Sequence, residues 1–572
     1  MLHPPASPRA HPPVIPLVLI ALSAQQPGGA WSHPQSWDSP LRDARLGSTL
    51  AAAGDLDGDG RGDVMVGAPQ GDLALSTFRR GHVIVYSGDS GAVIHQFDGL
   101  QATDGFGASV AGLGDVNGDG VSDLIAGARL FVGNYVRVFS GLTGGLLAHL
   151  PAPAGADGFG WALAPAGDLD ADGRADYWIG ARGDDPGGLN NAGTVTAYSG
   201  LTHLPLLTCK GAVANLFLGK AIAGGEDLDC DGTADLIAHS NGVGAGSVHC
   251  YSGATGALIR QHDGTVGQHV SMGNSLALIG DVDLDGCADY LYGDQYSISG
   301  GQEVGRAWLR SGLTGNLLWY EAGRTAGGRF GCAVAGLGDV NGDHTPEFAV
   351  GACNVELRWS TEHRGTVSVF SGAEFMLLQF LPGDDPGFHG VKEFGAAIAG
   401  VGDATGDLRD DFAVGAPRSG PGGHGDNGRV VLYSFNSYLR SSSASVSAAA
   451  GGVWGAEIDF PASYAGRAYK LIPSPVRPND ELDEEWAVWR GEPLPIVISP
   501  AGRRMWNNPY PMWTNAHGVL DVQGDAQVFL NAPSSVVQYF AGTAARLVAV
   551  VLPSPSDPAP AASGAVTLRF TP

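Results

Sequence analysis

Positive charge is scarce in this chain: 32 Lys and Arg residues stand against 58 Asp and Glu, a formal net charge of −26. A surface this acidic repels phosphate backbones, and no basic patch stands out in the sequence, which excludes nucleic acid as a partner. Apolar runs of eighteen residues are also missing after residue 30, which excludes a membrane-spanning helix there. Cations are the expected partners of such a surface.

Charged residues are few as well, at 16% of the chain, whereas apolar residues make up 44% and glycine occupies 89 of 572 positions. Because such a chain can bury enough apolar surface to fold, disorder is excluded. Abundant glycine disfavours helical bundles, since each interior Gly costs a helix about 1 kcal/mol. The sequence has no G-X-Y period, which excludes a collagen triple helix. The composition therefore predicts an all-β fold of strands and turns.

The first thirty residues differ from the rest. An apolar stretch from Val14 to Leu22 follows Arg9 and is itself followed by small residues. This order is typical of a secretory signal, and the stretch is too short to span a bilayer stably. The sequence therefore predicts a signal peptide in residues 1–30 and a secreted, extracellular or cell-surface protein.

One nine-residue acidic pattern, Asp-x-Asp/Asn-x-Asp-Gly-x-x-Asp, recurs in seven versions at intervals of 53 to 64 residues. Each unit reads as an apolar strand, the acidic loop and three further short strands, with no helical period. Radial stacking of seven such antiparallel sheets buries both faces of every blade. The repeats therefore predict a seven-bladed β-propeller over residues 31–437. The loops begin at Asp55, Asp115, Asp168, Asp227, Asp281, Asp339 and Asp403.

The acidic loops stop before the carboxy-terminal region. Residues 438–452 are rich in Ser, Ala and Gly, which predicts a flexible linker. Residues 453–572 alternate apolar and polar positions between Pro and Gly turns, which predicts a small antiparallel β-sandwich. Two segments compete for the outermost strand that closes the propeller, residues 31–45 and the strand near Ser437 to Arg440.

The units resemble the FG-GAP repeats of integrin alpha-subunit propellers and of related bacterial surface proteins. The resemblance covers roughly residues 45–437. Alpha-subunit propellers typically carry the acidic loop in only some blades, whereas every unit here has a version. The resemblance is therefore closer to a bacterial secreted type, and no beta-subunit partner is assumed. The motifs that carry the resemblance are the Phe-Gly pairs at Phe106, Phe159, Phe330 and Phe394 and the Gly-Ala-Pro triplets at Gly67 and Gly415.

Crowded carboxylates in each loop predict a bound cation. Like charges a few Å apart repel by several kcal/mol even at an effective dielectric constant of about 20. Hard oxygen ligands at alternate positions, with Gly relieving the turn, suit Ca²⁺ better than Mg²⁺. By analogy with EF-hand loops, and as the resemblance implies, the ligands would be the side chains at positions 1, 3, 5 and 9 and the carbonyl at position 7. We predict up to seven Ca²⁺ ions, one per blade. The predicted ligands are Asp55, Asp57, Asp59, Arg61 and Asp63; Asp115, Asn117, Asp119, Val121 and Asp123; Asp168, Asp170, Asp172, Arg174 and Asp176; Asp227, Asp229, Asp231, Thr233 and Asp235; Asp281, Asp283, Asp285, Cys287 and Asp289; Asp339, Asn341, Asp343, Thr345 and Glu347; and Asp403, Thr405, Asp407, Arg409 and Asp411.

The seven loops should not bind equally well. Four of them place Asp at all four side-chain positions, whereas loop two has Asn117, loop six Asn341 and loop seven Thr405. Fewer charges predict weaker binding. His344 and Leu408 replace the glycine of loops six and seven, which predicts strained turns and the weakest sites there.

The six cysteines all lie between Cys209 and Cys353, in a chain whose predicted export permits disulfides. Cys332 and Cys353 flank loop six almost symmetrically, which predicts a disulfide between them. Two other pairs stay open, Cys209 with Cys250 and Cys230 with Cys287.

Connectivity predicts a ligand face. In an up-and-down blade the loops between strands 2 and 3 lie at the end of the ring opposite the acidic loops. Exposed aromatic and Arg side chains on such loops are typical anchors for proteins or sugars. The predicted ligand-face residues are Phe78, Arg79, Arg80, Phe131, Tyr135, Tyr296, Trp359, His363, Arg364, Phe388 and His389.

No zinc spacing, HExxH motif or nucleophile elbow occurs in the sequence. The sequence therefore predicts a non-catalytic, calcium-binding adhesion or ligand-binding protein with a protein or glycan ligand. The alternative is a secreted carbohydrate-active or lipid-cleaving enzyme that uses the propeller as a scaffold.

Overall fold

The structure is a computed structural model that describes two compact units, the first ending at Leu439 and the second beginning at Arg440 apart from residues 563–565. Described with their side chains are residues 35–39, 43–70, 80–101, 104–129, 133–241, 244–355, 364–383, 392–420 and 426–435. Strand backbones are described at 31–32 and, with gaps, between 439 and 571. The signal peptide predicted for residues 1–30 lies outside the described residues.

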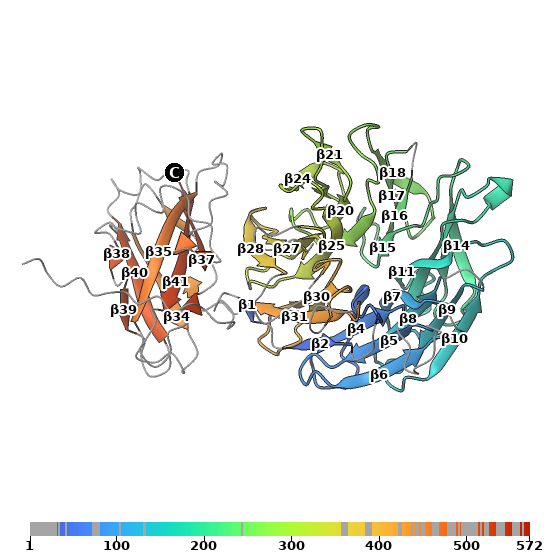
Figure 1. Cartoon of the computed structure of the whole chain (residues 1–572), viewed down its shortest axis with the longest axis horizontal. Coiled ribbons are helices and arrows are strands. Elements are labelled where there is room, and N and C mark those ends of the chain that lie inside the picture. Colours follow the sequence, from blue (N-terminus) through green and yellow to red (C-terminus); the bar gives the residue numbers. More distant parts are fainter. Residues whose placement is uncertain are drawn as a thin grey trace, which may run out of the picture. The chain divides into compact units, whose positions relative to one another are not determined.

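Seven antiparallel sheets, one for each repeat, form the ring of the first unit (Figure 1). The propeller is therefore all-β and seven-bladed, as the repeats predict. The blades are β3 (Thr49–Gly54), β4 (Asp63–Ala68), β5 (His82–Tyr86) and β6 (Val93–Asp98); β7 (Phe106–Gly114), β8 (Asp123–Ala128), β9 (Tyr135–Phe139) and β10 (Leu146–Pro151); β11 (Phe159–Gly167), β12 (Asp176–Ala181), β13 (Thr194–Tyr198) and β14 (Pro205–Lys210); β15 (Ile222–Gly224), β16 (Leu236–Ser240), β17 (Ser247–Tyr251) and β18 (Leu258–Asp263); β19 (Ser275–Leu278), β20 (Tyr290–Asp294), β23 (Arg306–Arg310) and β24 (Leu317–Ala322); β25 (Phe330–Gly338), β26 (Glu347–Ala352), β27 (Thr366–Phe370) and β28 (Leu377–Pro382); and β29 (Ala397–Gly402), β30 (Asp411–Ala416) and β31 (Arg429–Phe435).

Two small elements decorate the loops between strands 2 and 3. A 3₁₀ turn, η1 (Pro186–Gly188), lies in blade 3. A hairpin of β21 (Ile298–Ser299) and β22 (Gln302–Glu303) lies in blade 5. No helix of the described residues is long and apolar enough to cross a membrane.

The first strand of each blade lines the inside of the ring. First strands of neighbouring blades contact one another all the way round, from β3 through β7, β11, β15, β19, β25 and β29 back to β3. Second strands such as β4 and β8 are buried at every residue, which explains their unbroken apolar runs. Fourth strands such as β6 are largely exposed.

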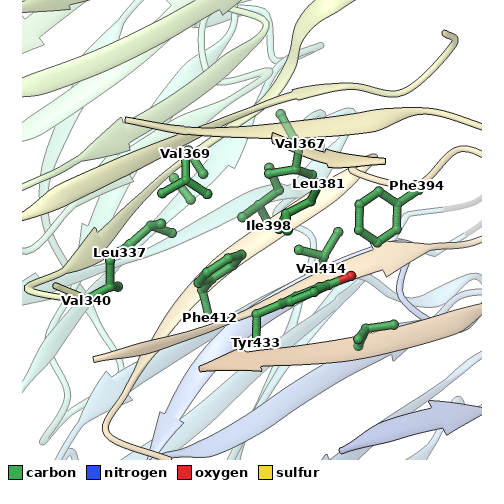
Figure 2. Close-up of a cluster of buried hydrophobic side chains, with 14 of the residues drawn as sticks. Leu337, Val340, Val367, Val369, Leu381, Phe394, Ile398, Phe412, Val414 and Tyr433 are labelled. Atoms are coloured by element: carbon green, nitrogen blue, oxygen red, sulfur yellow. The ribbon is translucent and has the colours of Figure 1, made fainter. Parts of the chain in front are cut away.

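The hydrophobic core lies between blades, where facing sheets pack their apolar side chains. Figure 2 shows the junction of blades 6 and 7, where Leu337, Val367 and Val369 of blade 6 face Phe412 and Val414 of blade 7. Equivalent clusters fill the other junctions. Each blade is therefore stabilised by its neighbours, which is why the repeats form a closed ring.

The amino-terminal segment closes the ring. β2 (Ser36–Asp38) pairs antiparallel with β31 as the outer strand of blade 7, and β1 (Trp31–Ser32) pairs with the end of β31. Trp37 is buried, stacks on Tyr86 at 4.8 Å and donates its indole N–H to the Gly91 carbonyl. Of the two competing segments, residues 31–45 supply the closing strand.

Strands also form in the second unit. They pair into one sheet in the order β32-β34-β40-β38 and another in the order β33-β43-β41-β35-β39, with β42 beside β41 and a separate β36-β37 pair. The small sandwich predicted for residues 453–572 stays a prediction. β32 and β33 fall within the predicted linker, and the backbone of β33 pairs with β43, for example Ser445 with Arg569. The strands are β32 (Leu439–Ser441), β33 (Ser445–Ser447), β34 (Gly452–Asp459), β35 (Ala468–Val476), β36 (Val488–Trp489), β37 (Glu492–Pro493), β38 (Trp513–Thr514), β39 (His517–Val519), β40 (Asp525–Ala532), β41 (Ala544–Val551), β42 (Ala561–Ala562) and β43 (Val566–Thr571).

Cys332 and Cys353 do not form the predicted disulfide, because both are free cysteines in the structure. Cys332 lies in a bulge of β25 where the register shifts between Phe330 and Val334, and Cys353 follows the last residue of β26. The two residues are thus not directly opposed on paired strands. Instead, the Cys353 backbone N–H donates to the Cys332 sulfur at 3.1 Å.

The disulfide in the described part of the chain joins Cys230 to Cys287, one of the two pairs left open, with Cα atoms 5.4 Å apart. Cys209 and Cys250, the other open pair, are buried free thiols. The bond links the acidic loops of blades 4 and 5, so it ties neighbouring blades together rather than two strands of one blade.

Candidate metal centres in the blade loops

Each acidic loop is folded around the carboxylate of its first residue. In loop one, Asp55 accepts backbone N–H groups from Gly58 at 2.8 Å and Asp59 at 3.1 Å on one oxygen, and from Gly60 at 2.8 Å on the other. Asp59 in turn accepts the Arg61 N–H at 2.9 Å. Equivalent bonds to the first residue recur in the other loops, so the sequence pattern encodes a conserved turn geometry along this chain.

The ninth residue of each loop is a buried acid that fastens the loop to its own blade. Asp63 is fully buried and accepts the Leu56 N–H at 2.8 Å and the Gly88 N–H at 3.2 Å. Gly88 lies in the turn between strands 3 and 4, so one carboxylate holds both turns together at the same end of the blade. Burial raises the pKa of Asp63 to about 6 and, with nearby loop carboxylates, that of Glu347 to about 9.

Four loops bring three carboxylates close together. In each, one oxygen from each of three acids lies within 4.8 Å of the others. Loops one, three and four unite positions 1, 3 and 9, whereas loop five unites positions 1, 3 and 5. These are the four loops with Asp at all four side-chain positions. The groups are Asp55, Asp57 and Asp63; Asp168, Asp170 and Asp176; Asp227, Asp229 and Asp235; and Asp281, Asp283 and Asp285.

In loops two and six an amide group lies between the carboxylates. The Asn117 amide nitrogen donates to Asp119 at 2.9 Å and to Asp123 at 3.2 Å. Asn341 makes the same two bonds, to Asp343 at 3.1 Å and to Glu347 at 2.6 Å. These amides already satisfy acceptors that a cation would need, in line with the weaker binding predicted for both loops.

Position 6 of every loop has a positive φ, which explains why glycine is usual there. His344 and Leu408 adopt it at 68° and 65°. A side chain in this left-handed region costs roughly 1–2 kcal/mol. Loops six and seven therefore carry the backbone strain that their sequences predict.

The donor set of the four all-Asp loops fits Ca²⁺. All side-chain donors are carboxylate oxygens, which a hard cation prefers, and they are preassembled on one turn. In loop four, the Asp229 Oδ1 atom is buried without a hydrogen-bond partner, although buried acceptors are normally satisfied. Repulsion from Asp231 and Asp227 adds to burial in raising the pKa of Asp229. A bound cation would satisfy that oxygen and relieve the repulsion.

Neighbouring loops also contact one another. The side chain at position 7 of one blade reaches position 4 of the blade before it. Arg174 lies against Gly118, where a Cβ atom would overlap its guanidinium group. Cys287 and Cys230 occupy the same two positions in blades 5 and 4, and there the contact is the disulfide. The sequence signal for this pairing was the placement of the two cysteines at positions 4 and 7 of consecutive repeats.

Exchanging acid and amide at position 3 tests whether these loops hold calcium. We expect Asn117→Asp to strengthen calcium binding about tenfold, because one more charged ligand replaces the amide bridge. Without calcium the same change lowers the melting temperature, since the new carboxylate faces Asp119 and Asp123. The converse change, Asp170→Asn in loop three, should weaken calcium binding and raise the melting temperature that is measured without calcium. Calorimetric calcium titrations and thermal melts measure these effects; a melting shift independent of calcium would contradict a metal site.

Four of the predicted ligand-face residues belong to the described part of the chain. Tyr135 is buried at 3% exposure and donates its hydroxyl to Asp104, so it is a core residue of blade 2 and not part of a ligand surface. Arg80 is exposed, and Tyr296 lies partly exposed beneath the Arg329 guanidinium, 5.6 Å from its ring centroid. Arg364 is only partly exposed. Phe78, Arg79, Phe131, Trp359, His363, Phe388 and His389 lie outside the described residues.

Comparison with known proteins identifies the repeats. The FG-GAP repeat model matches residues 46–94 and 106–139. Integrin alpha-V of Gallus gallus is 34% identical over 221 residues, 35% of this chain and 20% of its own length. Integrin alpha-5 of Xenopus laevis is 32% identical over 226 residues, 36% of this chain and 21% of its own length. Integrin alpha-PS2 of Drosophila melanogaster is 37% identical over 161 residues, 25% of this chain and 11% of its own length.

The aligned region is thus about a fifth or less of each relative's length. A solved structure titled "Structure of Dos1 propeller" covers 71% of this chain and 96% of its own at 12% identity, with a TM-score of 0.38, too distant to bear on the assignment. The matched repeats and the seven-bladed ring together identify the chain as an FG-GAP repeat β-propeller protein similar to integrin alpha subunits.

Proposed function

We propose that this chain is a calcium-binding, extracellular or cell-surface adhesion or ligand-binding protein without catalytic activity. The observation that carries the proposal is the preassembly of three carboxylates in each of four loops, all at one end of a ring. Ca²⁺ at these loops would supply positive charge that neutralises the acids. The ring would then be a rigid platform whose other end displays the variable loops to a partner.

Two further features support a location outside the cell. The Cys230–Cys287 disulfide would be stable in an oxidising compartment, and residues 1–30 read as a secretory signal. The proteins that the sequence matches are named as integrin alpha subunits. The second unit, proposed as a small β-sandwich, would follow the propeller as a separate module.

A binding array tests the proposal. The full chain, loaded with calcium, is applied to arrays of glycans and extracellular proteins and then washed with or without EDTA. We expect retention on at least one ligand in calcium and release by EDTA, because the loops rigidify the platform that binds it. The retained ligand is then checked for cleavage. Failure to retain any ligand, or turnover of the ligand, would overturn the proposed function and favour the enzyme alternative.

A further inference from the structure

Two arginines lie over one tryptophan at the junction of blades 2 and 3, and a lysine of blade 4 lies near one of them. The Arg182 guanidinium lies over the Trp161 ring at 3.5 Å and that of Arg129 at 4.5 Å from its centroid. Arg129 also donates to the Trp161 carbonyl at 3.3 Å. Lys220, from the next blade, directly follows Gly219, whose carbonyl oxygen lies against Gly180 two residues before Arg182, and the charges of Lys220 and Arg182 repel each other. All four side chains are partly exposed, so a ligand can reach them.

No carboxylate of the described residues forms an ion pair within 4.0 Å of these three cations. Burial and repulsion by Arg182 lower the pKa of Arg129 to about 10 and also lower the pKa of Lys220. In a chain of net charge −26, three cations without a counter-charge are unexpected. The arrangement destabilises the charged forms and would be relieved by an anion.

The two acids that follow Arg182 in the sequence are engaged elsewhere. Asp184 accepts the Thr194 hydroxyl at 2.8 Å, and Asp185 accepts the Asn191 N–H at 2.6 Å. Both therefore act as local turn acceptors. The positive charge of the cluster is left for a group from outside the described chain.

The repeats themselves show that the fold does not require this cluster. Arg129 and Arg182 occupy equivalent positions, directly after the Gly-Ala that ends strand 2. The other five blades have uncharged residues there: Pro69, Asn241, Gln295, Cys353 and Pro417.

The position that follows the Phe-Gly element shows the same contrast. Trp161 and Lys220 occupy it in blades 3 and 4. The other five blades have small or uncharged residues there: Ser48, Ala108, Asn274, Cys332 and Ala396. Charged and bulky side chains therefore gather at one sector of a ring whose other sectors form without them.

Chain direction places the cluster. The acidic loops join the end of strand 1 to the start of strand 2, whereas Arg129 and Arg182 follow strand 2, and Trp161 and Lys220 lie where strand 1 begins. All four thus lie at the end of the ring opposite the metal loops, at or beside the ends of its two inner strands. This inner site was missed by the sequence prediction, which considered the variable loops.

The chemistry of the cluster selects its ligand. Planar guanidinium groups bind carboxylates through paired hydrogen bonds, and an indole beneath them holds them in place. Because Arg182 already covers the Trp161 ring, stacking of a sugar on that ring is hindered. The overall negative charge repels polyanions, so a single acid in an otherwise uncharged segment fits best. We propose that Arg129, Arg182 and Lys220 form a binding site for the carboxylate of an acidic side chain in a partner peptide; this rests on the proposed ligand-binding function.

Saturation-transfer NMR with a short peptide tests the site. The calcium-loaded full chain at low salt is mixed with N-acetylated, C-amidated Gly-Gly-Glu-Gly-Gly or with the equally capped Gly-Gly-Gln-Gly-Gly, which has no carboxylate. We expect transfer to the Glu side-chain protons and little to Gln. Lys220→Met keeps the apolar part of the side chain and removes its charge. Arg182→Gln removes one of the two guanidinium groups. Each should weaken binding about tenfold or more, as expected for a lost charge-assisted hydrogen bond.

A matched control removes a positive charge elsewhere. Arg324 pairs with Glu321 in blade 5, so Arg324→Gln should leave peptide binding unchanged. Melting of Lys220→Met should occur at or above the wild-type temperature, because a repelled cation is removed. A lower melting temperature with undiminished peptide binding would show a structural role and overturn the proposal.

Two further outcomes separate the ligand classes. A glucuronate disaccharide that binds at this site when the Glu peptide does not would overturn the peptide assignment in favour of an acidic glycan. If the wild-type chain retains a ligand on the array, and Lys220→Met and Arg182→Gln retain it equally, the cation site is wrong while the ligand-binding function stands. Retention of no ligand by any form would instead remove the proposed function.

Discussion

Removal of calcium should lower the melting temperature of the full chain by about 10 °C or more. A site at a hundredfold excess of ligand over its dissociation constant contributes about 2.7 kcal/mol to the folded state, and four all-Asp loops together about 10 kcal/mol. For a domain this large, each kcal/mol corresponds to a shift of about 1–2 °C. Differential scanning calorimetry in EDTA and in millimolar calcium measures the shift.

The four groups of acids explain why the effect should be large. Without a cation, carboxylates such as Asp227 and Asp229 repel one another, and the buried Asp229 Oδ1 atom keeps no partner. Restoring calcium after chelation should restore the original melting temperature. Magnesium at the same concentration should restore less of it, since it fits the flexible oxygen cluster less well. An identical melting temperature in metal-free buffer and in calcium would show that calcium does not stabilise the fold.

Loss of the disulfide should have the second large effect. The bond closes a loop of 57 residues, and the chain-entropy estimate for such a loop is about 4 kcal/mol. We expect the double variant Cys230→Ser, Cys287→Ser to lose up to this free energy of unfolding. Loops four and five should also bind calcium more weakly, because the bond holds their turns against each other.

A second pair of cysteines supplies the control. Cys332 and Cys353 are adjacent but free, so the double variant Cys332→Ser, Cys353→Ser should lose much less stability. Reductant should bring the wild-type chain to the stability of the Cys230 and Cys287 variant and leave that variant unchanged. If reductant instead destabilised the Cys230 and Cys287 variant, a different disulfide would be stabilising the fold.

The blades were predictable because each local signal agrees with the fold. The apolar runs beginning at Phe106 and Asp123 coincide with β7 and β8, since an acidic turn separates them and a buried face demands continuous small or apolar residues. The left-handed turns at His344 and Leu408 were also predictable from the missing glycine. In each case the information lies within one repeat.

What the sequence left open depends on contacts between segments that lie apart in the chain, within a blade or between blades. Symmetry about loop six favoured Cys332 with Cys353, but the bulge in β25 and the contact between positions 4 and 7 of adjacent blades decide otherwise. Tyr135 reads as a loop aromatic, yet it stacks beside Phe106 inside blade 2. The cation cluster is visible only once strands 1 and 2 of three blades are brought together.

The pairing of β2 with β31 has a consequence for synthesis of the protein. Asp38 and Arg429 form an ion pair across 391 residues of chain, so the outer strand of blade 7 is made long before its partner. At translation rates of about 5–20 residues per second, the first segment waits roughly 20–80 s for the last repeat. During that interval the edge of β31 does not yet exist, and the growing protein is an open arc with exposed apolar faces at its leading blade. A chaperone that shields these apolar faces would act on the nascent chain and would lose its binding surface once β2 pairs with β31.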